Sequence, residues 1–138
     1  AASDVYKRQM NRSPPDRQRA ELAGRLAEWL ALCYLTLTGH RLLARRFQSS
    51  FGEIDLVVRR RKVIIFCEVK FRHRQGDDGL PSPRQRRRIC RAARDFIRQR
   101  RISPEFDFRI DLIRISRLSL RKTPPLNHLR DAWWCDQG

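Results

Sequence analysis

Cysteine is sparse in this 138-residue sequence, which contains four of them. There is no CxxC pair and no cluster of cysteine with histidine, so the common zinc-binding patterns are excluded. Cysteines this far apart favour core or surface thiols, and we expect all of them to be reduced in a cytoplasmic protein. They are Cys33, Cys67, Cys90 and Cys135.

Long hydrophobic runs are also missing. The most apolar stretch, WLALCYLTLT, has ten residues, about half the length that a membrane span requires. We therefore predict no transmembrane helix, no signal peptide and no membrane partner. The opening residues have neither periodicity nor a targeting pattern. We expect 1–15 to be a disordered or non-native leader and arm, and 16–134 to form a single domain.

Acidic residues are outnumbered. The chain has 31 Lys and Arg against 15 Asp and Glu, a formal net charge of +16 that is spread over most of its length. A field of this sign attracts polyanions, and nucleic acid is the usual one. The alternatives are an anionic membrane surface and a charge that serves only solubility. Nucleic acid is therefore the expected partner.

The apolar patterns that are present predict an α/β domain. Leucines recur at helical spacing from near Asp16 to Thr38, and Gly39 is a natural C-cap for that helix. Runs of β-branched and aromatic residues then predict three strands, a basic helix beginning near Pro83, and a fourth strand. The strands are expected at 41–48, 52–58, 62–72 and 106–115, the basic helix at 83–100, and the core stripe of the first helix at Leu22, Leu26, Leu30, Cys33 and Leu37.

Three charged residues interrupt the second and third strands, which otherwise look buried. If these strands pair around Arg61 and Lys62, then Asp55 lies opposite Glu68. Two adjacent carboxylates repel each other, so one pKa rises unless a cation joins them. Their oxygen atoms suit Mg²⁺ or Mn²⁺, and Lys70, on the same face as Glu68, would position or activate a water. The alternative is a salt bridge between Glu68 and Lys70 that serves the fold.

Other polar residues have both a functional and a structural interpretation. Glu28 lies near the apolar stripe of the first helix, where it would pair with Arg25 or reach solvent. The loop with His73, Asp77 and Asp78 reads as a solvated turn rather than a metal site. Trp133 and Trp134 either cap the core, which we favour, or stack on bases. The basic helix offers phosphate contacts or only a solvated face. Its candidate nucleic-acid-binding residues are Arg84, Arg87, Arg88 and Arg91.

Taken together, these elements resemble the YraN family, small bacterial proteins of unassigned function with a restriction-endonuclease-like fold. The similarity spans roughly residues 20 to 132 and rests on the GEIDL element, the EVK element and the helix with a glutamate before them. It implies a PD-(D/E)xK nuclease-type core, with a mixed central β-sheet flanked by helices in the order α-β-β-β-α-β. By this resemblance the catalytic residues are Asp55, Glu68, Lys70 and Glu28, and the metal ligands are Asp55, Glu68 and the carbonyl of Val69.

We therefore expect a metal-dependent endonuclease that hydrolyses phosphodiester bonds, with Mg²⁺ or Mn²⁺ as its cofactor and DNA favoured over RNA as its substrate. The alternative, from a different class, is a non-catalytic nucleic-acid-binding module that keeps the fold and uses the basic helix. A homodimer would allow two strands to be cut, and the sequence leaves this open.

Overall fold

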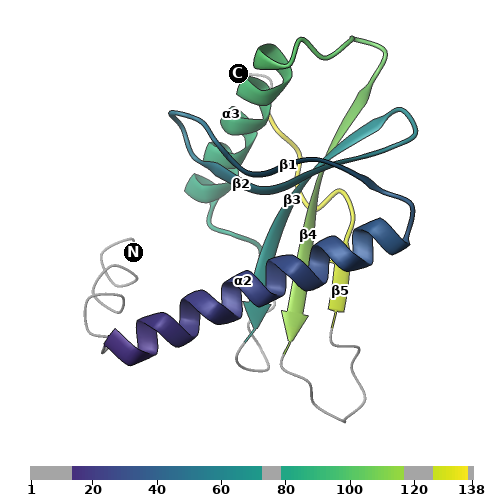
Figure 1. Cartoon of the computed structure of the whole chain (residues 1–138). Helices are drawn as coiled ribbons and strands as arrows, with labels where there is room; N and C mark the ends of the chain where they lie inside the picture. The colour runs from purple at the N-terminus through teal and green to yellow at the C-terminus, as the bar shows by residue number, and fades with distance from the viewer. Residues whose placement is uncertain (1–13, 73–78, 117–125, 137–138) are drawn as a thin grey trace.

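The computed structural model describes residues 14–72, 79–116 and 126–136. Of the leader and arm expected at 1–15, residues 1–13 lie outside these ranges, as do the loop residues His73, Asp77 and Asp78, whereas residues 14 and 15 begin the first helix. The α/β order predicted from the sequence is confirmed, and a short last strand is added to it (Figure 1). In chain order the elements are α2 (Pro14–Leu37), β1 (Arg41–Gln48), β2 (Glu53–Arg60), β3 (Val63–Arg72), α3 (Pro83–Gln99), β4 (Asp107–Ser116) and β5 (Leu126–Leu129).

The strands form one mixed sheet in the order β1-β2-β3-β4-β5. β3 and β4 are parallel, and every other neighbouring pair is antiparallel. A parallel pair needs a crossover connection, and α3 lies in the connection between β3 and β4. The turn between β2 and β3 falls at Arg61 and Lys62, as predicted. Arg61 has a φ of 54°, the left-handed conformation that a tight hairpin turn requires.

The two helices cover opposite faces of the sheet (Figure 1). Val57 and Phe66 pack under α3, whereas Leu56 and Ile65 pack under α2, so the predicted alternation holds along most of β2 and β3. Ile54 departs from it: it packs under α3 and not with Leu56. Ile54 pairs with Phe47 on β1, and both side chains pack in the cluster under α3.

The leucine stripe predicted for the core face of α2 is wrong. Ala27, Ala31 and Leu35 are the buried residues of this helix. They also recur every four residues, and small alanine side chains allow the helix to lie close to the sheet. No helix in the described part of the chain is long and apolar enough to cross a membrane. The exposed residues of the predicted stripe are Leu22, Leu26, Leu30, Cys33 and Leu37.

The expectation of four reduced thiols is also wrong. Cys90 on α3 and Cys135, after β5, form a disulfide with Cα atoms 5.6 Å apart, whereas Cys33 and Cys67 are free. The two bonded cysteines are separated by 45 residues and meet only because β4 and β5 bring the chain back to α3. The bond ties the segment that follows β5 to the basic helix.

Candidate active site

Asp55 and Glu68 come together where β2 meets β3. Leu56 pairs with Cys67, so Asp55 and Glu68 are the next residues to face each other. Oδ2 of Asp55 accepts a hydrogen bond of 2.8 Å from the backbone N–H of Val69. The charge of Asp55 also contributes to the raised pKa of Glu68, so the two carboxyl groups lie close together. The contact predicted by counting back from the turn is therefore present.

We call the carboxyl groups of Asp55 and Glu68 the carboxyl pair. The pKa of each is raised above its ordinary value. Burial, followed by repulsion from Asp55, raises the pKa of Glu68 to about 8, although Lys70 acts in the opposite direction. Burial also raises the pKa of Asp55 to about 6, against the hydrogen bond from Val69. Glu68 itself is only 7% exposed. Near neutral pH the carboxyl pair therefore holds a proton, because two negative charges at this buried position repel each other.

Lys70 lies at the boundary between the carboxyl pair and solvent. Its Nζ is 3.4 Å from Oε1 of Glu68, and its side chain is 44% exposed. The prediction that Glu68 and Lys70 share a face is confirmed by this contact. The ammonium group would meet a molecule that approaches the carboxyl pair, but the same distance also fits a salt bridge that serves the fold.

Glu28 reaches this region from α2, but not with the partners predicted for it. Nε of Arg46 on β1 donates a hydrogen bond of 3.0 Å to Oε2 of Glu28, whose side chain is 13% exposed. Arg46 is 18 residues away in the sequence, so helical spacing could not identify it. The negative charge of Glu28 still contributes to the raised pKa of Asp55. Glu28 is therefore close to the site and is held in an ion pair.

The carboxyl pair can offer two oxygen ligands to a metal ion. Within 14–72, 79–116 and 126–136 there is no group of three or more His, Cys, Asp or Glu side chains arranged to hold one. Mg²⁺ is commonly bound through one or two carboxylates, with waters and substrate phosphates completing its shell. Two hard oxygen donors that share a proton in the absence of a cation fit this chemistry. Asp55 and Glu68 are thus the candidate donors, to which the family resemblance adds the carbonyl of Val69.

The basic helix borders the same region. By alternation, Glu68 and Lys70 lie on the face of β3 that carries Phe66, which packs under α3. The turn before β2 also touches α3: a side chain added at Gly52 would meet Cβ of Arg88 at 3.3 Å, and the guanidinium of Arg91 lies 5.6 Å from the ring centre of Phe51. All four predicted phosphate-binding residues, Arg84, Arg87, Arg88 and Arg91, are exposed.

A second polar cluster was not predicted from the sequence. Asp111 is fully buried on β4 and accepts hydrogen bonds from Arg109 at 2.8 and 3.0 Å and from the backbone of Asp131 at 3.0 Å. Its Oδ2 is also 2.7 Å from Nε2 of His128, whose Nδ1 is 2.9 Å from the hydroxyl of Tyr34. Burial raises the pKa of Asp111, but the hydrogen bonds from His128 and Arg109 outweigh it and lower the pKa overall. The cluster therefore joins α2, β4 and β5.

Comparison with known proteins places the carboxyl pair and α3 in a segment that matches a protein family. The model of the family described as "Uncharacterised protein family UPF0102" matches residues 27–115. A UPF0102 protein of Rhodopseudomonas palustris (strain BisB18) is 37% identical over 125 residues, which are 90% of this chain and 93% of that protein. Another, of Maricaulis maris (strain MCS10), is 43% identical over 99 residues, 70% of this chain and 77% of that protein. The matched segment includes the carboxyl pair and α3.

Proposed function

We propose a function for this chain, which belongs to the UPF0102 family of YraN-like proteins: it is a metal-dependent nuclease that hydrolyses phosphodiester bonds of nucleic acid. The proposal is carried by two neighbouring carboxyl groups where β2 meets β3, that of Glu68, which is buried, and that of Asp55, which is partly buried. A salt bridge with Lys70 needs only one carboxylate. A second one adds desolvation and repulsion, which destabilise the fold unless a cation is bound.

The residues of the site would divide the work between them. Asp55, Glu68 and the carbonyl of Val69 would hold Mg²⁺ or Mn²⁺, which when bound supplies a Lewis acid for a phosphate group. Lys70 orients the attacking water and stabilises negative charge that develops on the phosphoryl oxygens. Glu28 adds negative charge beside Asp55 and is kept in place by Arg46.

The charge of the chain supports nucleic acid as the substrate. The net charge is +16, and α3 exposes arginines beside the segment that leads into Asp55. These arginines would neutralise phosphates and position a strand at the carboxyl pair without reading its sequence. We favour DNA over RNA because the motifs resemble those of restriction-endonuclease-like proteins.

A non-catalytic nucleic-acid-binding module is the second candidate. It is favoured by one observation: Arg46 holds Glu28 in an ion pair, which leaves two carboxyl groups for a metal ion rather than three. Such a module would bind nucleic acid through α3, and the carboxyl pair would have no part in that binding.

A cleavage screen separates these candidates. Linear, branched and single-stranded DNA and RNA are incubated with the full chain and Mg²⁺ or Mn²⁺, beside Glu68→Gln and Lys70→Ala. A nuclease predicts metal-dependent cleavage that both variants lose, while Lys70→Ala still binds metal in a calorimetric titration because it removes no ligand. Binding of nucleic acid without cleavage of any substrate would favour the module instead.

A further inference from the structure

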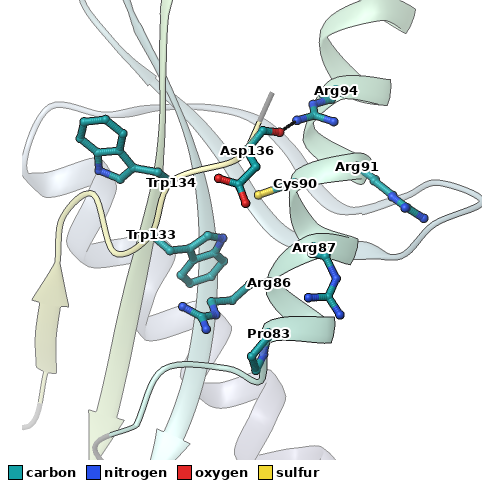
Figure 2. A pocket seen from close by; sticks show the side chains of 9 residues that line it. All are labelled: Pro83, Arg86, Arg87, Cys90, Arg91, Arg94, Trp133, Trp134 and Asp136. Atoms are coloured by element: carbon teal, nitrogen blue, oxygen red, sulfur yellow. Dashed lines mark hydrogen bonds between the residues drawn. The ribbon is translucent and has the colours of Figure 1, made fainter. Parts of the chain in front are cut away.

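A pocket of about 380 Å³ lies between α3 and the segment after β5 (Figure 2). α3 supplies four arginines to its lining, and the segment after β5 supplies Trp133, Trp134 and Asp136. The Cys90–Cys135 disulfide joins the two walls. The volume of the pocket is within the range of small-ligand sites. We call it the arginine pocket, after Arg86, Arg87, Arg91 and Arg94.

Two nitrogen donors in the lining of the arginine pocket have no hydrogen-bond partner. Nε1 of Trp133 and Nε of Arg86 are both buried and unpaired, and Trp133 as a whole is only 6% exposed. Figure 2 shows both side chains at the same pocket. A buried donor without an acceptor is destabilising and uncommon in native proteins. The arginine pocket is therefore suited to a ligand that brings acceptor atoms.

The charge of the lining indicates what these acceptors are. The lining contains four guanidinium groups and one carboxylate, that of Asp136, and Arg94 donates to the backbone carbonyl of the same residue. Arg87 and Arg91 are exposed. A guanidinium group matches the geometry of a phosphate group and can donate two parallel hydrogen bonds to its oxygens. A phosphate group is thus the ligand chemistry that fits.

Trp134 adds an aromatic surface next to this phosphate site. We predicted that both tryptophans cap the core. That is confirmed for Trp133 but wrong for Trp134, which is 83% exposed. Trp134 also lines an adjoining pocket of about 460 Å³, the aromatic pocket, with Phe108 and Ile97. Bases stack readily on exposed aromatic rings, but only when they are unpaired. The two pockets together therefore match one phosphate and one unpaired base.

We propose that the arginine pocket binds a backbone phosphate of a single nucleic-acid strand, while Trp134 stacks on the neighbouring base in the aromatic pocket. The protein then prefers strands with unpaired bases to continuous duplex. This inference rests on the proposal that the substrate is nucleic acid, but it does not depend on metal binding or cleavage at the carboxyl pair.

Fluorescence anisotropy of the full chain in EDTA tests the inference. The labelled ligands are an oligothymidylate, an abasic strand with the same number of phosphates, and a duplex. The oligothymidylate should bind on the order of tenfold tighter than the abasic strand, because stacking is lost in the latter. Trp134→Ala should abolish this difference and leave the affinity for the abasic strand unchanged. Arg86→Gln should weaken both, since it removes a phosphate contact.

Matched controls lie on α2. Trp29→Ala removes another exposed tryptophan, 52% exposed, and should keep the tenfold difference, while Arg19→Gln removes one positive charge far along the chain from α3. Because Arg86 is partly buried, Arg86→Lys is measured beside Arg86→Gln. Arg86→Lys should weaken binding less than Arg86→Gln does. Both variants should have the melting temperature of the unaltered chain.

Three results would overturn the inference. The first is equal affinity of the unaltered chain for the oligothymidylate and the abasic strand. The second is a difference that survives Trp134→Ala. The third is that the unaltered chain binds polyglutamate as tightly as it binds the oligothymidylate. That result would assign the pocket to an acidic protein. A strand preference that persists without any metal binding in calorimetry would support the pocket and contradict the nuclease. If the chain bound none of the nucleic acids, both proposals would be removed.

Discussion

Replacing Glu68 with glutamine should stabilise the metal-free protein at neutral and higher pH. Burial and repulsion from Asp55 raise the pKa of Glu68 from 4.5 to about 8 in the folded chain. Between these values the folded state retains a proton that the unfolded state releases, so the free energy of unfolding falls as the pH rises. At about 1.4 kcal/mol per pH unit within this window, the loss from pH 5 to pH 7.5 is about 3 kcal/mol.

Urea unfolding followed by circular dichroism in EDTA measures this effect. The free energy of unfolding of Glu68→Gln, minus that of the unaltered chain, should increase by about 3 kcal/mol between pH 5 and pH 7.5. Asp55→Asn should show a smaller increase, because the pKa of Asp55 is raised only to about 6. Millimolar Mg²⁺ should restore part of the stability of the unaltered chain and have little effect on Glu68→Gln.

The opposite result would refute the reasoning. If Glu68 is present to form a stabilising salt bridge with Lys70, Glu68→Gln should be less stable than the unaltered chain at pH 7.5. Parallel stability curves for the two proteins across this pH range would show that the pKa of Glu68 is not raised by folding. Either outcome would remove the argument that the carboxyl pair is kept at a cost to the fold.

Three further predictions concern other parts of the molecule. Log affinity for nucleic acid should fall linearly with log salt, by about a thousandfold between roughly 50 and 200 mM for about six phosphate contacts, and a flat response in a salt titration would count against backbone binding. Asp111→Asn should destabilise the fold by about 3 kcal/mol or more in urea unfolding, because it leaves the partly buried charge of Arg109 and the ring of His128 poorly paired, whereas an unchanged midpoint would show that the cluster is dispensable. Reduction of the Cys90–Cys135 bond should lower the free energy of unfolding by about 2–4 kcal/mol, and unfolding curves that coincide with and without dithiothreitol would contradict this.

The strand pairing of the site could be predicted from the sequence. A period of two residues fixes which side chains share a face, and the turn at Arg61 and Lys62 fixes the register. Counting back from that turn was enough to bring Asp55 opposite Glu68. The raised pKa values followed from the same contact, because they depend on burial and on like charge.

The features that depend on contacts distant in the sequence could not be predicted. Two neighbouring rows of α2 have four-residue spacing, and the row of small alanines contacts the sheet, which depends on the shape of the partner rather than on hydrophobicity. Glu28 pairs with Arg46 on another element, although Arg25 is the local basic residue. The walls of the arginine pocket come together only after β5 returns the chain to α3.

The central claim is that the carboxyl pair binds a divalent cation, and calorimetric titration of Mn²⁺ into the full chain near pH 7 tests it most directly. Because the pair holds a proton at this pH, binding should release it, and the measured heat should vary with the ionisation enthalpy of the buffer. We predict saturable binding with proton release, abolished in both Asp55→Asn and Glu68→Gln. No saturable binding at millimolar Mn²⁺, even with nucleic acid present, would contradict the account.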